Sequence, residues 1–468
     1  MSDSKTTNTL AEEAERTAIA EGLARLSRWA VEALALPLPE ATQRKAALVM
    51  MDDLAATSAA HGQPELIALR NMALGNGYPA EATIFAPGGP RTDKHSAAVI
   101  NGTAGCWCEL DEGYRGAPCH GGLYVLPALL GEAELRGLNV GQVLKILAVS
   151  YEVAARVAEA WTFPGISVHP HAAFGNFGAA AAAGLARGVT AEQLAAALRI
   201  AGGVVPAGAY QAAVEGALVR NLWTGQSAST GMSAVNWALA GMDGYRDGPH
   251  QAFRHLFGAT LRVEKLTDQL GQRWAIELGY HKLHGCCHST HAAVEAALDM
   301  RTQFDVNNRL AELTHVDLYT HRPTMSNTCP ENSLAARFSF EHVVAVALVQ
   351  GHTKPSAFES SALEDRSVRT VREKIRLLPY APLPAWPLDR PARLELGLAN
   401  GSVLRSECLS APGGPDQPLS GEDLLRKVSE LTRDDYPNFS DMARRIVELK
   451  PEVLQEQWAR VVSSLLMR

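Results

Sequence analysis

Residues 280–291 read Tyr280-His281-Lys282-Leu283-His284-Gly285-Cys286-Cys287-His288-Ser289-Thr290-His291, and an apolar run with helical spacing follows directly over residues 292–298. The twelve residues hold one Lys, four His and two Cys, which are side chains that carry protons, bind anions or ligate metals. The first turn of a helix offers backbone N–H groups that have no partner inside the helix, and such groups bind anions. The stretch therefore predicts a functional site at the start of a helix.

The chain before this stretch has the spacing of helices. Apolar residues recur at intervals of three and four over residues 24–36, 44–60, 64–75, 121–135 and 140–160. Gly137 is expected to end one helix and Asn139 to cap the next, and Thr190-Ala191-Glu192-Gln193 has the pattern of a capping box. Five consecutive Ala at 179–183, with Gly nearby, predict helices that pack closely.

The pattern changes after about residue 265. Thr314–Thr320 alternates and is rich in β-branched residues, which predicts a strand. Asn400-Gly401 stands between two alternating runs, Arg393–Leu398 and Ser402–Leu409, and this arrangement predicts a β-hairpin.

Further helices are expected among and after these strands. Helical spacing covers residues 290–304, 340–351 and 365–377. Residues 379–391 are rich in Pro and predict an excursion over the surface, whereas Ser420-Gly421-Glu422-Asp423 opens a last helical stretch that we expect to pack back on the first domain. The sequence thus predicts a mainly α fold, with a large helical domain of residues 1–265 and 412–468 and a smaller α+β domain of residues 266–411.

Composition narrows the class of protein. A chain of 468 residues exceeds the usual single domain, and 47% hydrophobic with 20% charged residues fits a large, well-buried or oligomeric protein. The net charge is −7 and Lys and Arg form no patch, which argues against nucleic acid and an anionic membrane surface as partners. The polar start over residues 1–15 lacks the apolar core of a signal peptide, and the apolar stretches 172–186 and 200–214 are too short to span a membrane. Seven Cys, an odd number, fit reduced thiols, so we expect a cytoplasmic protein.

An acidic loop is the second candidate for chemistry. Residues 101–122 are rich in Gly and hold Glu109, Asp111, Glu112 and His120 between two predicted helices. Carboxylates that lie close together raise one another's pKa, and a nearby His can share the proton. The loop predicts an acid–base group, and a solvated surface loop is the alternative on these residues alone.

Two more clusters suit an anionic ligand. His169-Pro170-His171 stands at the start of the Ala-rich helix, where a His is also often only a cap or a core partner. Arg220, with Trp223 and Gln226, precedes a helix of small residues, and Arg can grip a carboxylate through two N–H groups. A lone Arg is more often an ordinary surface residue.

A zinc site is the alternative use of the Cys residues. Cys287 and His291 stand four residues apart and would share one face of a helix, and Cys106, Cys108, Cys119 and His120 could complete the ligand set. In that case the protein would be a non-catalytic helical scaffold held together by zinc. The spacing lacks the paired CxxC motifs that make such a prediction strong.

Residues 282–291, followed by the Ala-rich helix, resemble the segment K-P-Y-x-x-C-x-x-x-H of the MmgE/PrpD family. Other segments resemble that family in the same order along the chain, between roughly residues 20 and 460. They are Glu109-Leu110-Asp111-Glu112-Gly113 with His120, His169-Pro170-His171-Ala172-Ala173-Phe174-Gly175, Arg220-Asn221-Leu222-Trp223-Thr224-Gly225, Tyr319-Thr320-His321-Arg322-Pro323 and Ala336-Arg337-Phe338-Ser339-Phe340. The ordered set is specific to the family.

The resemblance implies a fold and a class of reaction. The family includes 2-methylcitrate dehydratase, cis-aconitate decarboxylase and iminodisuccinate epimerase. It implies a large helical domain made from both chain ends, a smaller α+β lid, a homodimer, and no metal or organic cofactor. Its members act on small di- or tricarboxylates at a carbon next to a carboxylate.

The resemblance also implies which residues act. Catalysis is assigned to Asp111, His120, His169, Lys282 and Tyr319. Substrate binding is assigned to Arg220, Trp223, His284 and His291. Arg220 stands where the family usually has Lys and Trp223 where it usually has His; Arg keeps its proton at working pH, so Arg220 would only bind.

We therefore expect a cofactor-independent lyase of the dehydratase type, which removes a proton next to a carboxylate of a small di- or tricarboxylic acid. An epimerase (isomerase) or a decarboxylase acting on a similar acid is the alternative, since one pocket supports all three reactions with small changes in which group moves the proton. The zinc-held scaffold is the alternative outside enzymes.

Overall fold

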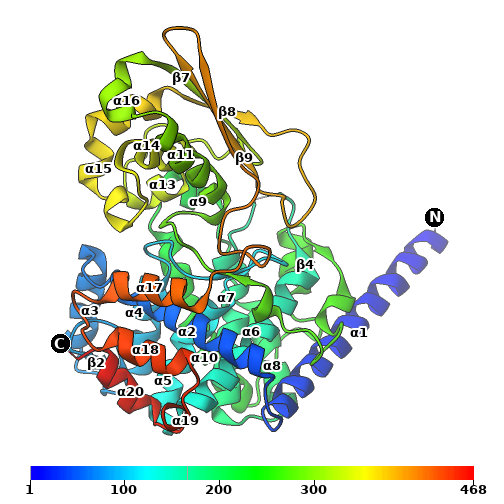
Figure 1. Ribbon diagram of the computed structural model, residues 1–468. Helices are drawn as coiled ribbons and strands as arrows, with labels where there is room; N and C mark the ends of the chain where they lie inside the picture. Colours follow the sequence, from blue (N-terminus) through cyan, green and yellow to red (C-terminus); the bar gives the residue numbers. More distant parts are fainter. Residues whose placement is uncertain (1, 166, 468) are drawn as a thin grey trace.

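The computed structural model describes residues 2–165 and 167–467, and most of them are helical (Figure 1). The predicted fold class, mainly α with a smaller α+β part, is confirmed. In these two ranges, no helix combines the length and the apolar character that a membrane span requires.

A bundle of helices, which we call the helical body, forms the larger part. Its elements are α1 (Ser2–Ala33), α2 (Glu40–Ala59), α3 (Pro64–Gly75), α4 (Lys94–Gly105), α5 (Gly121–Arg136), α6 (Val140–Ala160), α7 (Pro170–Arg187), α8 (Ala191–Gly203), α10 (Val219–Leu239), α17 (Gly421–Thr432), α18 (Phe439–Val447), α19 (Pro451–Leu454) and α20 (Trp458–Leu465). The predicted caps are confirmed, because Asn139, Thr190 and Ser420 each make a complete capping box and Gly137 ends α5 at φ 62°.

The Ala run lies at the centre of this body. Ala179–Ala183 of α7 are fully buried between α5, α6 and α10. Small residues on the facing helix permit this approach, since a Cβ added at Gly231 of α10 would lie 2.5 Å from the Cβ of Ala179. The prediction of closely packed helices is therefore confirmed.

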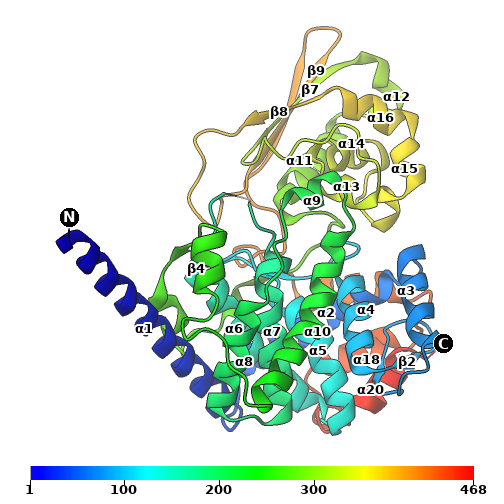
Figure 2. The ribbon, with the colours of Figure 1, turned by 180° about the vertical axis from the view of Figure 1, so that it is seen from behind.

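The smaller part, which we call the lid, is built on a four-stranded sheet that stands above the helical body (Figures 1 and 2). The strands run in the order β10-β9-β7-β8, where β7 is Leu313–Thr320, β8 Ile375–Pro379, β9 Ala392–Leu398 and β10 Val403–Cys408. Helices α11 (His291–Gln303), α13 (Ser333–Phe338), α14 (Phe340–Gln350), α15 (Ser360–Glu364) and α16 (Arg366–Glu373) belong to the lid as well. The predicted hairpin is confirmed, with β9 and β10 antiparallel and Gly401 in the turn at φ 83°.

One predicted helix ends earlier than expected. Helical spacing favoured a helix over residues 365–377, but α16 stops at Glu373, and Ile375–Pro379 form strand β8. This strand pairs in parallel with β7, with Val316 opposite Ile375. Hydrogen bonding to a neighbouring strand, which local spacing does not report, decides the conformation here.

The two parts have separate hydrophobic cores. The core of the helical body uses residues from 19 to 276 and again from 425 to 466. The lid core uses residues 286–398 together with Tyr210, Ala213 and Val214 around the short helix α9 (Gln211–Glu215). The division of the chain at residues 265 and 411 stays a prediction, as do the homodimer and the cytoplasmic location.

Two contacts hold the acidic loop in place between body and lid. Strand β3 (Gly113–Tyr114) pairs with β6 (Gly279–Tyr280), which brings the loop beside the segment that leads into Lys282. From the C-terminal part of the chain, Lys427 of α17 donates to the carbonyl of Leu110 over 2.7 Å and lies 2.5 Å from Asp52 of α2. Segments from four distant parts of the sequence thus meet at one place.

Candidate active site

A cavity of about 100 Å³ opens between the helical body and the lid. This volume is below the roughly 300 Å³ at which pockets for drug-sized ligands begin, so the cavity suits a small molecule. Its charged, imidazole and aromatic lining residues are Glu109, Tyr114, His120, His169, Tyr210, Arg220, Tyr280, Lys282, His288, Arg322, Phe338 and Arg390. Cationic side chains outnumber carboxylates on this wall, which favours an anionic ligand.

Glu109 and Asp111 of the acidic loop share one cation. Lys282 Nζ donates to Glu109 Oε2 over 3.0 Å and to Asp111 Oδ1 over 3.1 Å, and all three side chains are buried. Burial acts to raise the pKa of Asp111, but Lys282 and His120 outweigh it and hold that pKa well below its usual value. Both carboxyls are therefore ionised, and Lys282 stays charged between them.

The backbone at Glu109 adopts a conformation that residues other than Gly rarely take, with φ at 53°. Such strain persists where surrounding contacts impose it, and it occurs often at functional sites. Here the contacts are the ion pairs of Glu109 with Lys282 and with Arg220, whose guanidinium binds its carboxylate.

Arg220 lies at the start of α10 and is fully enclosed. It also donates to the side-chain oxygen of Asn221 over 3.1 Å, and its guanidinium lies 5.1 Å from the ring centre of Phe338 in the lid. Glu109 raises the pKa of Arg220 despite burial, so the side chain keeps its charge at any working pH.

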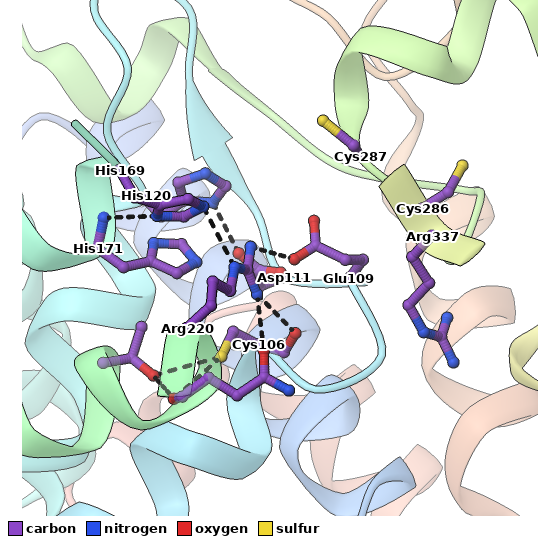
Figure 3. A network of polar contacts seen from close by, with 12 residues as sticks. Cys106, Glu109, Asp111, His120, His169, His171, Arg220, Cys286, Cys287 and Arg337 are labelled. Atoms are coloured by element: carbon purple, nitrogen blue, oxygen red, sulfur yellow. Dashed lines mark hydrogen bonds and ion pairs between the residues drawn. The ribbon is translucent and has the colours of Figure 1, made fainter. Parts of the chain in front are cut away.

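His120 and Asp111, which were predicted to form an acid–base pair, lie in contact (Figure 3). His120 Nδ1 lies 2.6 Å from Asp111 Oδ2 and 2.8 Å from the carbonyl oxygen of Glu112. Both partners are acceptors, so the neutral form of the ring has its proton on Nδ1 and a lone pair on Nε2. Since His120 lines the cavity, this nitrogen is available to take a proton from a ligand.

His169 and His171 complete a group of three imidazoles. The ring of His171 lies 4.8 Å from that of His120 and 4.5 Å from that of His169, between centres. Arg220 Nε lies 3.2 Å from His169 Nε2, and the backbone N–H of His171 lies 3.2 Å from His169 Nδ1. A neutral imidazole accepts at one of its two nitrogens, so one of these two contacts is a hydrogen bond at a time. Burial, and then the charge of Arg220, lower the pKa of both rings well below the usual value, so both are neutral.

Beneath the cavity lies a pair of buried carboxyls, Glu112 and Asp53. The backbone N–H of Glu112 donates to Asp53 Oδ1 over 2.8 Å, and the Glu112 side chain accepts from Tyr151 over 3.0 Å and from the N–H of Gly122 over 2.7 Å. Burial raises the pKa of Glu112 to about 8 and, with Glu112 beside it, raises that of Asp53 well above its usual value. At neutral pH Glu112 is therefore largely protonated.

Replacing Glu112 by Gln is expected to stabilise the protein at high pH and to change little at low pH. In the parent, the pKa of Glu112 is about 8 in the folded state and about 4.5 in the unfolded state, so its protonation stabilises the fold below pH 4.5 and this stabilisation is lost as pH rises to 8. Gln stays neutral throughout. The difference in thermal midpoint between variant and parent should grow from pH 5 to pH 9. The same change at the exposed Glu65 is the control. A difference that stays constant with pH would contradict the raised pKa of Glu112.

The structure brings five of the predicted site residues together: Asp111, His120, His169, Arg220 and Lys282. Four others lie elsewhere. Trp223 lies behind the lining, with its ring centre 5.6 Å from that of His169, and Tyr319 lies on β7 beneath Arg393. His284 is hydrogen-bonded to Glu295 and Thr353 over 2.8 Å each. His291 is hydrogen-bonded to the carbonyl of Cys286 over 3.2 Å.

Several lining residues were not assigned from the sequence. Glu109 was recognised only as part of the acidic loop, although its spacing of two from Asp111 was a usable signal. Arg322 lies in the segment after β7 that carries the family resemblance. Arg390 comes from the Pro-rich stretch predicted to run over the surface, and no pattern there marks it.

A metal site was the alternative use of these groups. Within the described ranges, a single group of three His, Cys, Asp or Glu has its ligand atoms within 4.8 Å of one another: Asp111, His120 and His171. Both oxygens of Asp111 are already engaged, by His120 and by Lys282, and a further cation beside Lys282 would be repelled. The group suits an anion better than a metal.

The Cys residues do not assemble as the zinc hypothesis requires. Cys106 lies below Arg220, whereas Cys286 and Cys287 lie on a separate segment across the site (Figure 3). The thiol of Cys106 contacts the carbonyl of Asn221 and the hydroxyl of Thr224, and burial raises its pKa to about 12. The prediction that zinc is held by Cys106, Cys108, Cys119, Cys287 and His291 is therefore wrong, because the ligand atoms of these residues do not come together in the part of the chain that the structure describes.

Removal of metal is accordingly expected to leave the protein unchanged. Dialysis against EDTA should alter neither the thermal midpoint nor the activity, because the buried charges of the site are balanced by Lys282 and Arg220. A fall in the midpoint that zinc restores would contradict this.

Two family models match the chain. Residues 24–260 match the MmgE/PrpD N-terminal domain, and residues 284–452 match the MmgE/PrpD C-terminal domain. The chain belongs to the MmgE/PrpD family. The resemblance that the motifs indicated is thereby confirmed.

This MmgE/PrpD chain is also similar to curated proteins along most of its length. It is 23% identical over 416 residues to the cis-aconitate decarboxylase-like protein oryM of Aspergillus oryzae, which covers 80% of this chain and 82% of that protein. It is 26% identical over 391 residues to the cis-aconitate decarboxylase of Mus musculus, with 76% of each covered, and 26% identical over 354 residues to that of Homo sapiens, with 71% of each covered.

Proposed function

We propose that this protein is a lyase that removes a proton next to a carboxylate of a small di- or tricarboxylic acid. The observation that carries the proposal is the pair His120–Asp111, which directs an unprotonated imidazole nitrogen to a cavity walled by Lys282 and Arg220. A base and two fixed cations at one small cavity are what carbon-acid chemistry requires.

The proposed first step is abstraction of the proton by His120. The C–H bond breaks, its proton goes to Nε2, and its electron pair moves into the neighbouring carboxylate, which then carries two negative charges. Asp111 stabilises the imidazolium that forms, and Lys282 stabilises the charge on the substrate. These groups are held in place before the substrate arrives, so little reorganisation accompanies the reaction.

The second step expels a group from the next carbon. The electron pair returns, forms the double bond and breaks the C–O bond of the leaving hydroxyl, which takes the proton that His120 carries and leaves as water, so that His120 is again a neutral imidazole. We assign His169 to this side of the reaction, because it lines the cavity as a neutral imidazole that Arg220 orients. Tyr319, whose ring lies under Arg393, is given no role.

Decarboxylation is the second candidate, and the names of the relatives favour it. In that reaction the C–C bond to a carboxylate breaks and carbon dioxide leaves. The electron pair of the broken bond stays on the substrate carbon, which then takes a proton from His120 in its imidazolium form. The same residues serve, with the first proton transfer running in the opposite direction.

Proton NMR in D₂O tests the proposal. The protein is incubated with a panel of hydroxy-, amino- and unsaturated di- and tricarboxylates, including citrate and cis-aconitate. New vinyl signals without release of carbon dioxide identify a dehydratase, and deuterium exchange without loss of substrate identifies an epimerase. Release of carbon dioxide, measured on the same sample, identifies a decarboxylase. No reaction and no exchange with any acid of the panel would contradict the proposed function.

A further inference from the structure

Two arginines of the lid, Arg322 and Arg390, line the cavity opposite the machinery described above. Arg322 follows β7, and Arg390 ends the Pro-rich stretch just before β9. Neither forms an ion pair with a carboxylate anywhere in residues 2–165 and 167–467. The one side-chain hydrogen bond between Arg390 and these residues runs from its Nη1 to His288 Nδ1, over 2.6 Å.

His288 orients Arg390 rather than neutralising it. Burial, and then Arg390 itself, lower the pKa of His288 well below its usual value, so the ring is neutral and its Nδ1 can accept. The ring is fixed by Tyr280, which stacks on it at 3.9 Å between centres and 26° between planes. The remaining N–H groups of Arg390 are left for a ligand.

The positive charges here repel one another. Burial, and then the charges of Arg115 and Arg322, lower the pKa of Arg390 to about 10. Arg115 is paired with Asp389, and Asp416, which lines an adjoining cavity with Arg390, makes no ion pair with it among the described residues. A bound anion would remove this repulsion.

Charge counting around the whole cavity gives the same result. Five cationic side chains stand at or next to it, namely Arg115, Arg220, Lys282, Arg322 and Arg390. Three carboxylates are paired with them, namely Glu109, Asp111 and Asp389. With the buried imidazoles neutral, two positive charges are unmatched, and both belong to the lid.

We propose that Arg322 and Arg390 form a second carboxylate subsite, which binds a carboxylate of the substrate distant from the carbon that reacts. The inference rests on the proposed function, and it assigns two residues of this chain to the second carboxylate of the substrate. Guanidinium groups match the planar shape of a carboxylate and bind it through paired N–H donors. A monocarboxylic acid would leave these two charges facing each other and would bind weakly.

Binding of two unreactive acids, tricarballylate and butyrate, tests the subsite. Isothermal titration calorimetry is applied to the parent and to Arg322→Gln and Arg390→Gln. Each substitution is expected to raise the Kd for tricarballylate by about ten- to hundredfold, the effect of losing hydrogen bonds to a charged group, and to leave the Kd for butyrate unchanged. Arg405→Gln, on the exposed face of the hairpin with 70% of its side chain accessible, is the matched control and should change neither.

Three results would overturn the subsite: unchanged tricarballylate binding in both variants, an equal loss for both acids, or a parent that binds the two acids equally. Arg390→Lys keeps the charge without the planar donor pair and should give an intermediate Kd. Thermal midpoints identify any variant that is unfolded. The NMR panel separates the two proposals. If the protein reacts with an acid of the panel but binding does not depend on Arg322 and Arg390, only the subsite is excluded. If binding depends on these arginines but no acid reacts or exchanges, only the proposed function is excluded.

Discussion

Replacement of His120 by Gln is expected to lower kcat by roughly 10²- to 10⁴-fold while the fold is retained. Gln can fill part of the imidazole volume and donate to Asp111, but it cannot accept a proton from carbon. The measurement is kcat on the acid that the NMR panel identifies, together with circular dichroism of the variant. His255→Gln, at an exposed position, is the matched control.

Asp111→Asn gives an independent view of the same pair. Its amide N–H₂ would face His120 Nδ1, now 2.6 Å from a carboxylate oxygen, and would favour the tautomer with the proton on Nε2. That tautomer cannot act as a base towards the cavity, so we expect a loss comparable to that of His120→Gln. Activity within tenfold of the parent in either variant would remove the pair from the mechanism.

Replacement of Lys282 by Met is expected to lower the free energy of unfolding by about 3–5 kcal/mol at pH 7 and to abolish activity. The variant leaves Glu109 and Asp111 buried without their common cation. Urea unfolding measures the loss, and Lys354→Met, at a lysine whose side chain is 64% exposed, is the matched control.

The loss should be smaller at pH 5 than at pH 7. In the parent, the pKa of Asp111 is held below its usual value, so the contribution of this ion pair is complete above that usual value and is lost only in strong acid. Without Lys282, burial raises the pKa instead, and protonation at pH 5 relieves the unpaired charge. Adding Asp111→Asn to Lys282→Met should recover part of the stability, because Glu109 keeps Arg220 as its cation and Asp111 has lost its own. No recovery would show that the loss comes from packing.

Much of the fold follows from local sequence. Helices α3 and α6 have the predicted bounds, and the caps at Asn139 and Thr190 form as their side chains require. Local spacing failed at residues 375–377, where pairing with β7 across the lid made a strand. The candidate site was predictable as a set of residues. Asp111 and Lys282 meet although 171 residues separate them, and both lie in motifs that occur in the order seen in the family.

The sequence misplaced single residues where the direction of a side chain determines whether it reaches the cavity. Val316, Leu318 and Thr320 of β7 are fully buried, so the alternation of a strand turns Tyr319 to the opposite face, beneath Arg393. That argument was available from the sequence. Arg390 was not predictable, because its Pro-rich stretch has no periodicity and only the path of the chain back to β9 brings it to the cavity.

The way in which the helical core is assembled also has a consequence for biosynthesis. A ribosome produces residues 425–466 well after residues 19–276, yet the two ranges belong to the same core. The lid core, drawn from residues 210–214 and 286–398, is complete in the nascent chain before then and can fold first. Until α17 emerges, Lys427 cannot hold Asp52 and Leu110, so the acidic loop gains this support only after the lid core can form. The apolar faces that pack against α17, α18 and α20 stay uncovered during that interval.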